Sequence, residues 1–256
     1  MKKIYSFSFS KIPFYISSIV FYSTIIMILY FTLYTAYIIL FCYNESFVKY
    51  DDSLTFNNTE KWGTDELNIL ENISSNEEQL INKIKHSPPN SNSSKHTIRE
   101  INDILEKQKH ITDDRIQDMR EELFLFSIIQ RFNVNEEEYY ILEKIITQNV
   151  NPVILKLKSK YNRVRPYILD KRIKPIISKP QHPSYPSGHS TQVHFISNIL
   201  SNKYPKNKKK YQKTAEYIAV NREYAGFHYK SDTDFGKHIA NVLANYYISN
   251  GNPIIY

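Results

Sequence analysis

The chain has 256 residues, of which 41% are hydrophobic and 23% are charged. This balance is typical of a folded protein and excludes a fully disordered chain or a coiled-coil rod. A single cysteine, Cys42, excludes a disulfide framework and a multi-cysteine zinc site. The net charge of +7 is unevenly distributed, because residues 148–256 hold 18 Lys or Arg against 5 Asp or Glu. This basic half could attract phosphate, nucleic acid or anionic lipid.

The N-terminal region contains a long uncharged segment. No charged residue occurs over residues 12–44, and residues 19–41 are mainly apolar. A helix needs about 20 apolar residues to cross a bilayer. A cleaved signal peptide is the alternative, but its apolar region would have only about 7–15 residues, followed by a small-residue cleavage site. We therefore expect a retained transmembrane anchor over residues 12–43.

The charges that flank this segment indicate its orientation. Lys2, Lys3 and Lys11 precede it, whereas Glu45, Asp51 and Asp52 follow it with only Lys49 opposing them. Positive residues are retained on the cytoplasmic side of a membrane. We expect a cytoplasmic tail over residues 1–11 and an exofacial or lumenal location for everything that follows the anchor.

The remaining chain is polar at first and then helical in pattern. Residues 44–85 are rich in Asn and Ser and are expected to form a polar stalk with one amphipathic helix. From residue 97, apolar stripes with a helical period recur, and no β-hairpin pattern is found. We expect an all-α bundle as the catalytic domain over residues 86–256. The stripes lie at residues 98–105, 123–129, 140–146, 193–200, 215–219 and 239–246.

A first stretch of chemical interest combines Lys158 with Arg165 and Pro166. Seven residues of a helix turn about 700°, close to two full turns. The spacing therefore predicts that Lys158 and Arg165 point the same way from one helix. Taken alone, two such cations are typical of a solvated surface.

Two further stretches lie nearer the C-terminus. Pro186-Ser-Gly-His189 directly precedes an apolar stripe, so these small residues are expected to begin a helix whose N–H groups can bind an anion. Farther along, Arg222 ends a stripe that Gly226 breaks. His228 and Asp232 follow at a spacing where a carboxylate can hold an imidazole ring. Each stretch alone is compatible with a purely structural role.

The three stretches together resemble the signature of the phosphatidic acid phosphatase type 2 superfamily, which is Lys-x6-Arg-Pro, Pro-Ser-Gly-His and Ser-Arg-x5-His-x3-Asp. Ten of its eleven specified positions match, and Asn221 stands where the signature has Ser. The resemblance covers about residues 86–250 and is greatest to the class A bacterial acid phosphatases, which are related to vanadium haloperoxidases. It implies a helical bundle of the acid phosphatase/vanadium haloperoxidase type. Because Asn keeps donors and an acceptor, we expect retained activity, with a changed rate left open.

The resemblance also implies a metal-independent acid phosphatase without a cofactor. His228 would be the nucleophile that forms a phosphohistidine, Asp232 would hold its other ring nitrogen, and His189 would protonate the leaving alkoxide. Phosphotransfer to a second acceptor is left open. The cations and donors implied for phosphate binding are Lys158, Arg165, Ser187, Gly188 and Arg222.

Other functions remain as alternatives. The same site could act as a lipid phosphate phosphatase at the membrane, as a vanadate-loaded haloperoxidase, or as a non-enzymatic phosphate-binding membrane protein. The expected partners are a phosphomonoester substrate and the membrane around residues 12–43. We expect no nucleic-acid partner, because the lysines of residues 206–210 are typical of a solvated loop. A homo-oligomer is left open.

Overall fold

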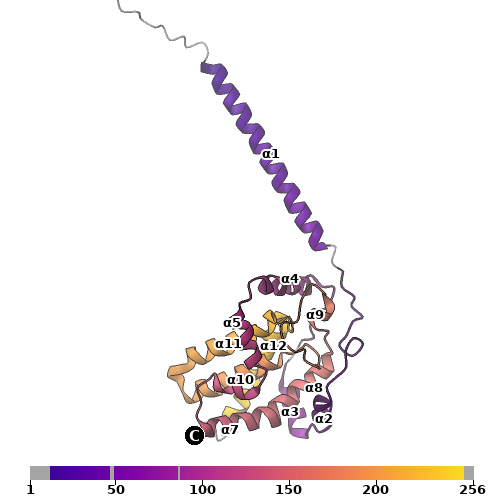
Figure 1. Ribbon diagram of the computed structural model, residues 1–256, viewed down its shortest axis with the longest axis vertical. Helices are drawn as coiled ribbons and strands as arrows, with labels where there is room; N and C mark the ends of the chain where they lie inside the picture. Colours follow the sequence, from indigo (N-terminus) through magenta and orange to yellow (C-terminus); the bar gives the residue numbers. More distant parts are fainter. Residues whose placement is uncertain (1–11, 47–48, 86, 251–256) are drawn as a thin grey trace, which may run out of the picture. The chain divides into compact units, whose positions relative to one another are not determined.

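The structure is a computed structural model that describes residues 12–46, 49–85 and 87–250. It divides into two compact units, residues 1–49 and residues 50–256, which are drawn together in Figure 1. The tail expected over residues 1–11, with Lys2, Lys3 and Lys11, lies outside the described residues.

The first unit contains one long helix, α1 (Ile12–Ser46). Its segment Val20–Ile38 is long and apolar enough to cross a membrane, although a signal sequence near an N-terminus would pass the same test. The hydroxyl groups of Ser23 and Thr24 each donate a hydrogen bond to the carbonyl oxygen of Val20 at 2.8 Å. Hydroxyls that bond back to their own helix do not oppose insertion into a bilayer.

The second unit is built from helices, and the described residues contain no β-strand beyond one isolated bridge between Thr55 and Arg163. This confirms the all-α fold. Its α-helices are α2 (Thr64–Glu71), α3 (Ser75–Lys83), α4 (Lys95–Lys109), α5 (Asp113–Glu121), α6 (Leu125–Gln130), α7 (Glu136–Ile145), α8 (Asn151–Tyr161), α9 (Pro166–Leu169), α10 (Gly188–Lys203), α11 (Lys208–Tyr224) and α12 (Lys230–Ser249). A π-helical turn, η2 (Ile146–Val150), joins α7 to α8, and a 3-10 turn, η3 (Pro205–Asn207), precedes α11.

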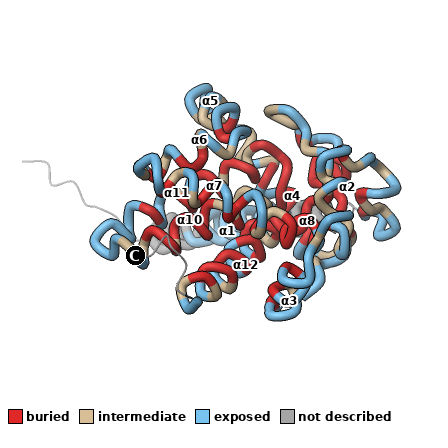
Figure 2. Tube along the Cα trace, turned by 90° about the horizontal axis from the view of Figure 1, so that it is seen from below, coloured by how far each residue is buried: buried red, intermediate tan, exposed pale blue. Residues whose placement is uncertain are grey.

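Helix α10 lies at the centre of this unit and packs against both α11 and α12. Its apolar side chains face several directions at once, so the helix is buried around most of its circumference. Figure 2 shows buried segments of α10, α8 and α12 in the interior, with exposed turns on outer helices such as α3 and α5. The fully buried apolar residues of α10 are Val193, Phe195, Ile196, Ile199 and Leu200.

Helix α12 approaches the N-terminus of α10 closely because Gly236 has no side chain. A Cβ atom at Gly236 would lie 2.6 Å from the carbonyl oxygen of Ser187 and 2.9 Å from the Cβ of Ser190. Only glycine allows this contact, which joins the helix that carries His189 to the helix that carries Asp232.

The compact unit begins at Tyr50, whereas the sequence led us to expect a stalk over residues 44–85 and a domain that starts at residue 86. Phe56 is completely buried, and Leu80 and Ile84 belong to the main hydrophobic core. The N–H of Phe56 also donates to the carbonyl oxygen of Asn162 at 3.0 Å. Residues 50–84 have few apolar side chains, so composition alone suggested a stalk, but those few side chains pack into the domain.

Candidate active site

Lys158 and Arg165 approach the same region from different segments, which corrects the expectation that they share a helix. Helix α8 ends at Tyr161, because Asn162 adopts a left-handed conformation with φ of 48°. Arg165 is extended and precedes the first turn of α9, as expected for a residue before proline. Both side chains are completely buried.

Each of these buried cations is held by main-chain carbonyl groups. The Lys158 Nζ donates to the carbonyl oxygens of Pro183 at 2.7 Å and Ser184 at 3.2 Å. The Arg165 guanidinium donates to the carbonyl oxygens of His182 at 2.9 Å and Phe227 at 2.9 Å. Among the residues that the structure describes, neither side chain has a direct carboxylate partner, and burial lowers the pKa of Lys158 well below its usual value. A bound anion would favour the charged forms of both side chains.

Helix α10 begins at Gly188, as the sequence predicted. Ser187 is its N-cap residue, and the Ser187 Oγ accepts a hydrogen bond from the N–H of Ser190 at 3.3 Å. The N–H of Ser187 donates to the main-chain oxygen of Asp232, which fixes the start of α10 against α12. The positive end of the α10 dipole therefore lies at the site.

The third stretch also folds as the sequence predicted. Helix α11 ends at Tyr224, two residues after Arg222, and Gly226 then adopts a φ of 77° that favours glycine. The turn places His228 next to Asp232 in the first turn of α12, with 3.1 Å between the His228 Nδ1 and the Asp232 Oδ2.

The ring nitrogens of His228 have different neighbours. Because a carboxylate only accepts, the contact with Asp232 assigns the ring proton to Nδ1. The Nε2 atom lies 3.5 Å from the Nη1 of Arg165, a donor, so Nε2 is the unprotonated nitrogen that accepts this long contact. Burial lowers the pKa of His228 to about 3, against the opposing effect of Asp232. The imidazole is therefore neutral over most of the pH range.

His189 lies on the first turn of α10 and contacts a second polar group of residues. Its Nε2 is 2.8 Å from the main-chain oxygen of Glu122 and 3.2 Å from the Nη1 of Arg222. Burial, and then the charge of Arg222, lower the pKa of His189 well below its usual value. Burial lowers the pKa of Arg222 only to about 10, so this guanidinium stays charged at neutral pH.

Asn221, which departs from the signature, is buried beneath this second group. The Asn221 Nδ2 donates to both carboxylate oxygens of Glu122 at 3.0 Å, and the Asn221 Oδ1 accepts from the Nη1 of Arg115 at 2.7 Å. The Glu122 carboxylate also lies 3.6 Å from the Arg222 Nη2. The amide of Asn221 therefore links α11 to the residue that contacts both His189 and Arg222.

A pocket of about 380 Å³ gathers part of the predicted set. Gly188, His189, Arg222 and His228 line it, whereas Lys158, Arg165, Ser187 and Asp232 lie behind its lining. The remaining wall is mixed, because polar side chains such as Asp65, Glu66 and Lys179 line it beside the apolar residues Ile69, Leu123, Ile154, Leu155 and Phe227. Within the parts of the chain that the structure describes, no cluster of three His, Cys, Asp or Glu side chains could hold a metal ion.

Several residues of the site were not identified from the sequence. Arg163 and Ser184 both contact Asp232, and the main-chain oxygen of Glu122 contacts His189. His182 lines the pocket, and its Nδ1 lies 3.0 Å from the Arg165 Nη2. Only His182 carried a signal, because it lies seven residues before His189 and could line the entrance of the site. The others are common residue types whose partners lie 48 to 69 positions away.

Comparison with known proteins finds a matching family model and solved structures of similar fold. The family model of the PAP2 superfamily matches residues 139–252. No curated protein matches the chain. A bacterial vanadium-dependent iodoperoxidase is 17% identical, with a TM-score of 0.49, over 64% of this chain and 53% of that one. A holo-type bacterial vanadium-dependent chloroperoxidase is 13% identical, with a TM-score of 0.51, over 75% of this chain and 56% of that one.

The chain thus spans just over half the length of these two enzymes, and the likeness to the chloroperoxidase concerns the fold alone. The family match is more specific, because residues 139–252 include all three motif stretches from Lys158 to Asp232. Residues 139–252, somewhat less than half of the chain, thus match the family model of the PAP2 superfamily.

Proposed function

We propose that the chain is a phosphomonoester hydrolase that acts through a phosphohistidine at His228. The observation that carries this proposal is the environment of the His228 ring. Its Nδ1 is held by Asp232 at 3.1 Å, and its Nε2 faces the pocket beside Arg165. A neutral imidazole with one nitrogen fixed and the other free is a nucleophile.

Substrate binding would rest on the chain's own cations. A phosphate dianion in the pocket would meet Arg222 directly, with the charges of Lys158 and Arg165 behind the lining and the start of α10 beside it. Phosphoryl transfer needs chiefly positioning and neutralisation of charge on the equatorial oxygens. Three cations and a helix N-terminus supply both, so we propose that hydrolysis needs no metal and survives EDTA.

The reaction would proceed in two steps. In the first, the His228 Nε2 attacks phosphorus, the bond from phosphorus to the ester oxygen breaks, and His189 gives a proton to the leaving oxygen. In the second, water attacks phosphorus while His189 takes its proton, the bond from Nε2 to phosphorus breaks, and phosphate leaves. Asp232 accepts the Nδ1–H bond throughout and stabilises the positive charge of the phosphorylated ring.

Hydrolysis of p-nitrophenyl phosphate by the full chain in detergent micelles tests this function. Replacing the nucleophile, as in His228→Ala, should lower kcat by about 10⁴-fold or more. The matched control is His110→Ala, because His110 is an exposed histidine at the end of α4 that does not line the pocket. Phosphate binding without turnover by the unchanged chain would instead favour the non-enzymatic alternative.

A lipid phosphate is the second candidate substrate. The apolar part of the pocket wall, with Ile69, Leu123 and Leu155, favours it because an alkyl chain could bury its surface there. A long-chain alkyl phosphate should then show a higher kcat/KM than p-nitrophenyl phosphate, and Leu123→Ser should reduce only that advantage. Equal kcat/KM values for both substrates would exclude a preference for lipid phosphates and favour a general phosphomonoesterase.

We also propose that α1 anchors the enzyme in a membrane as a single span, with the catalytic unit exofacial or lumenal. The exposed side chains of Val20–Ile38 and the flanking charges support this arrangement.

A further inference from the structure

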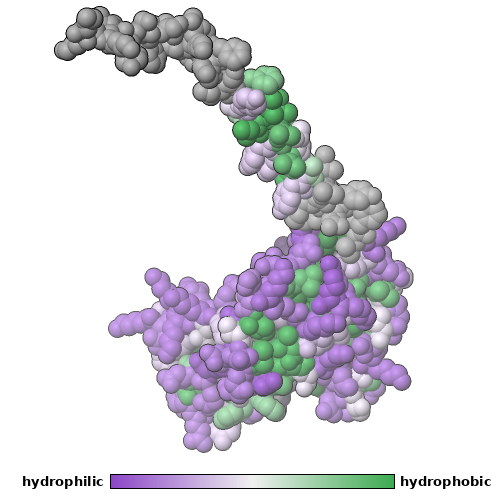
Figure 3. Space-filling view, turned by 45° about the horizontal axis from the view of Figure 1, so that its top comes forward, coloured by the Kyte–Doolittle hydropathy of each residue, from purple (hydrophilic) through white to green (hydrophobic). Residues whose placement is uncertain are grey.

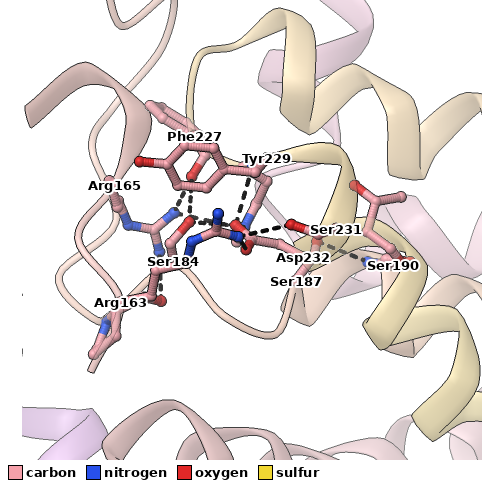
Figure 4. Close-up of polar contacts among 12 residues, drawn as sticks. Arg163, Arg165, Ser184, Ser187, Ser190, Phe227, Tyr229, Ser231 and Asp232 are labelled. Carbon is pink, nitrogen blue, oxygen red and sulfur yellow. Dashed lines mark hydrogen bonds and ion pairs between the residues drawn. The ribbon is translucent and has the colours of Figure 1, made fainter. Parts of the chain in front are cut away.

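Arg163 lies next to the catalytic residues, although it is not part of the family signature. Its side chain is 2% exposed, and its Nη1 donates to the Asp232 Oδ1 at 2.6 Å and to the Ser231 Oγ at 2.8 Å. Figure 4 shows Arg163, Ser184 and Tyr229 converging on the Asp232 carboxylate, while Arg165 turns toward Phe227. Arg163 therefore contacts the partner of the nucleophile rather than the pocket.

The two oxygens of Asp232 have separate partners. Oδ1 accepts the hydrogen bond from Arg163, whereas Oδ2 accepts from the Nδ1 of His228, from the N–H of Tyr229 at 3.1 Å and from the Ser184 hydroxyl. A carboxylate held on one side by a guanidinium cannot turn freely about its Cβ–Cγ bond. The oxygen that faces His228 is therefore fixed in direction.

Arg163 is itself held in place from two sides. Its Nη2 lies 3.3 Å from the Glu100 Oε2, and its guanidinium stacks over the Tyr229 ring at 3.7 Å. The Glu100 Oε1 also accepts the N–H of Ser231. The two carboxylates offset the charge of this buried arginine, and an unpaired charge there would be strongly destabilising.

We propose that Arg163, held by Glu100, is a positioning residue that fixes the Asp232 carboxylate and thereby keeps the proton of His228 on Nδ1. This inference rests on the proposed function, because the Nδ1–H form leaves Nε2 free to attack phosphorus. Without Arg163, Asp232 can rotate away from the ring, and the proton distributes between both nitrogens. The chemical step then slows, while substrate binding in the pocket is retained.

The test combines kinetics with nitrogen NMR of histidine-labelled full chain in detergent micelles. For Arg163→Met we expect kcat to fall about 10- to 100-fold with little change in KM, the loss typical when an outer partner of a functional residue is removed. The imidazole signals of His228, assigned with His228→Gln, should change from the Nδ1–H form to a mixture of forms. Arg163→Lys keeps the charge and one donor, so it should restore most of both properties.

Two controls separate positioning from general damage. Arg172→Met removes another Arg–Asp pair, with Asp170, outside the pocket lining and should leave both readouts unchanged. The double variant Arg163→Met with Glu100→Gln keeps the buried charge balanced, so it should fold even where the single variant does not. It should still show the mixed imidazole forms, since Asp232 again lacks its guanidinium.

The NMR measurement stays informative without catalysis. An unchanged chain that hydrolyses no phosphomonoester would refute the proposed function, yet the effect of Arg163 on His228 would still be measured. Retention of the pure Nδ1–H form in the folded Arg163 variants would overturn the positioning role. An unchanged kcat in a fully active enzyme would overturn it equally.

Discussion

At the scale of single residues, the proposed mechanism requires His189 and His228 to differ in protonation, although burial lowers the pKa of both. His228 has to be neutral to attack, and its pKa of about 3 ensures this from mildly acidic pH upward. His189 has to be protonated when the ester bond breaks. A bound phosphate dianion would raise the pKa of His189, because it offsets the nearby charge of Arg222.

This division predicts the pH dependence of kcat. A general acid acts only while protonated, so kcat should fall as pH rises through the pKa that His189 has in the substrate complex. In His189→Gln, that alkaline fall should disappear, and the loss in kcat should be larger for an alkyl phosphate than for p-nitrophenyl phosphate. The reason is that p-nitrophenolate leaves readily without a proton. Equal losses for both substrates would contradict the assignment of His189.

At the scale of helices, the site depends on the close packing of α12 against the start of α10. Gly236→Ala would place a Cβ atom 2.6 Å from the Ser187 oxygen, so one helix must move. The hydrogen bond from the N–H of Ser187 to the main-chain oxygen of Asp232 lies in the same contact between α10 and α12. We therefore expect the substitution to lower the free energy of unfolding by about 1–3 kcal/mol and to lower kcat.

The exposed residue Asn245, on the same helix, offers the control for this substitution. Asn245→Ala should leave both the thermal unfolding midpoint and the activity close to those of the unchanged chain. A Gly236→Ala variant as stable and active as the unchanged chain would show that the contact between α10 and α12 is not needed.

Local signals in the sequence predicted the helix boundaries that matter most. Small residues before an apolar stripe indicated the start of α10 at Gly188, and Gly226 indicated the end of α11. The same reasoning was wrong for Lys158 and Arg165, because a left-handed Asn162 ends α8 between them. Pro166 disfavours a helical Arg165, but the sequence did not locate the left-handed turn at Asn162.

The contacts of Asp232 could not be predicted for a different reason. Arg163 donates to the Asp232 carboxylate from a position 69 residues earlier in the chain. Glu100 accepts from the N–H of the neighbouring Ser231, which lies 131 residues later. Such pairs depend on how the helices pack against one another, and a single sequence does not reveal that packing. The motif identified residues that gather in or beside the pocket, but not the residues that hold them in place.

At the scale of the whole molecule, the uneven charge of the sequence is partly explained by the site. The described residues include four buried Lys or Arg side chains, and all four belong to the site: Lys158, Arg163, Arg165 and Arg222. Figure 3 shows that the surface of the domain is largely hydrophilic around a smaller apolar area. The basic character of residues 148–256 therefore reflects both the buried cations of the candidate site and ordinary solvated side chains.

The apolar helix α1 and the charges that flank it in the sequence lead to a prediction about membrane topology. If α1 is a retained anchor, the full chain should pellet with membranes and resist carbonate extraction. In sealed vesicles, the catalytic unit of residues 50–256 should be protected from added protease when it is lumenal, while the first dozen residues or so are cleaved. Replacing Lys2, Lys3 and Lys11 with Glu should weaken this orientation, since positive charges retain a tail in the cytoplasm. A soluble product shortened by roughly forty residues would indicate a cleaved signal peptide instead, because cleavage follows the apolar segment and releases the domain.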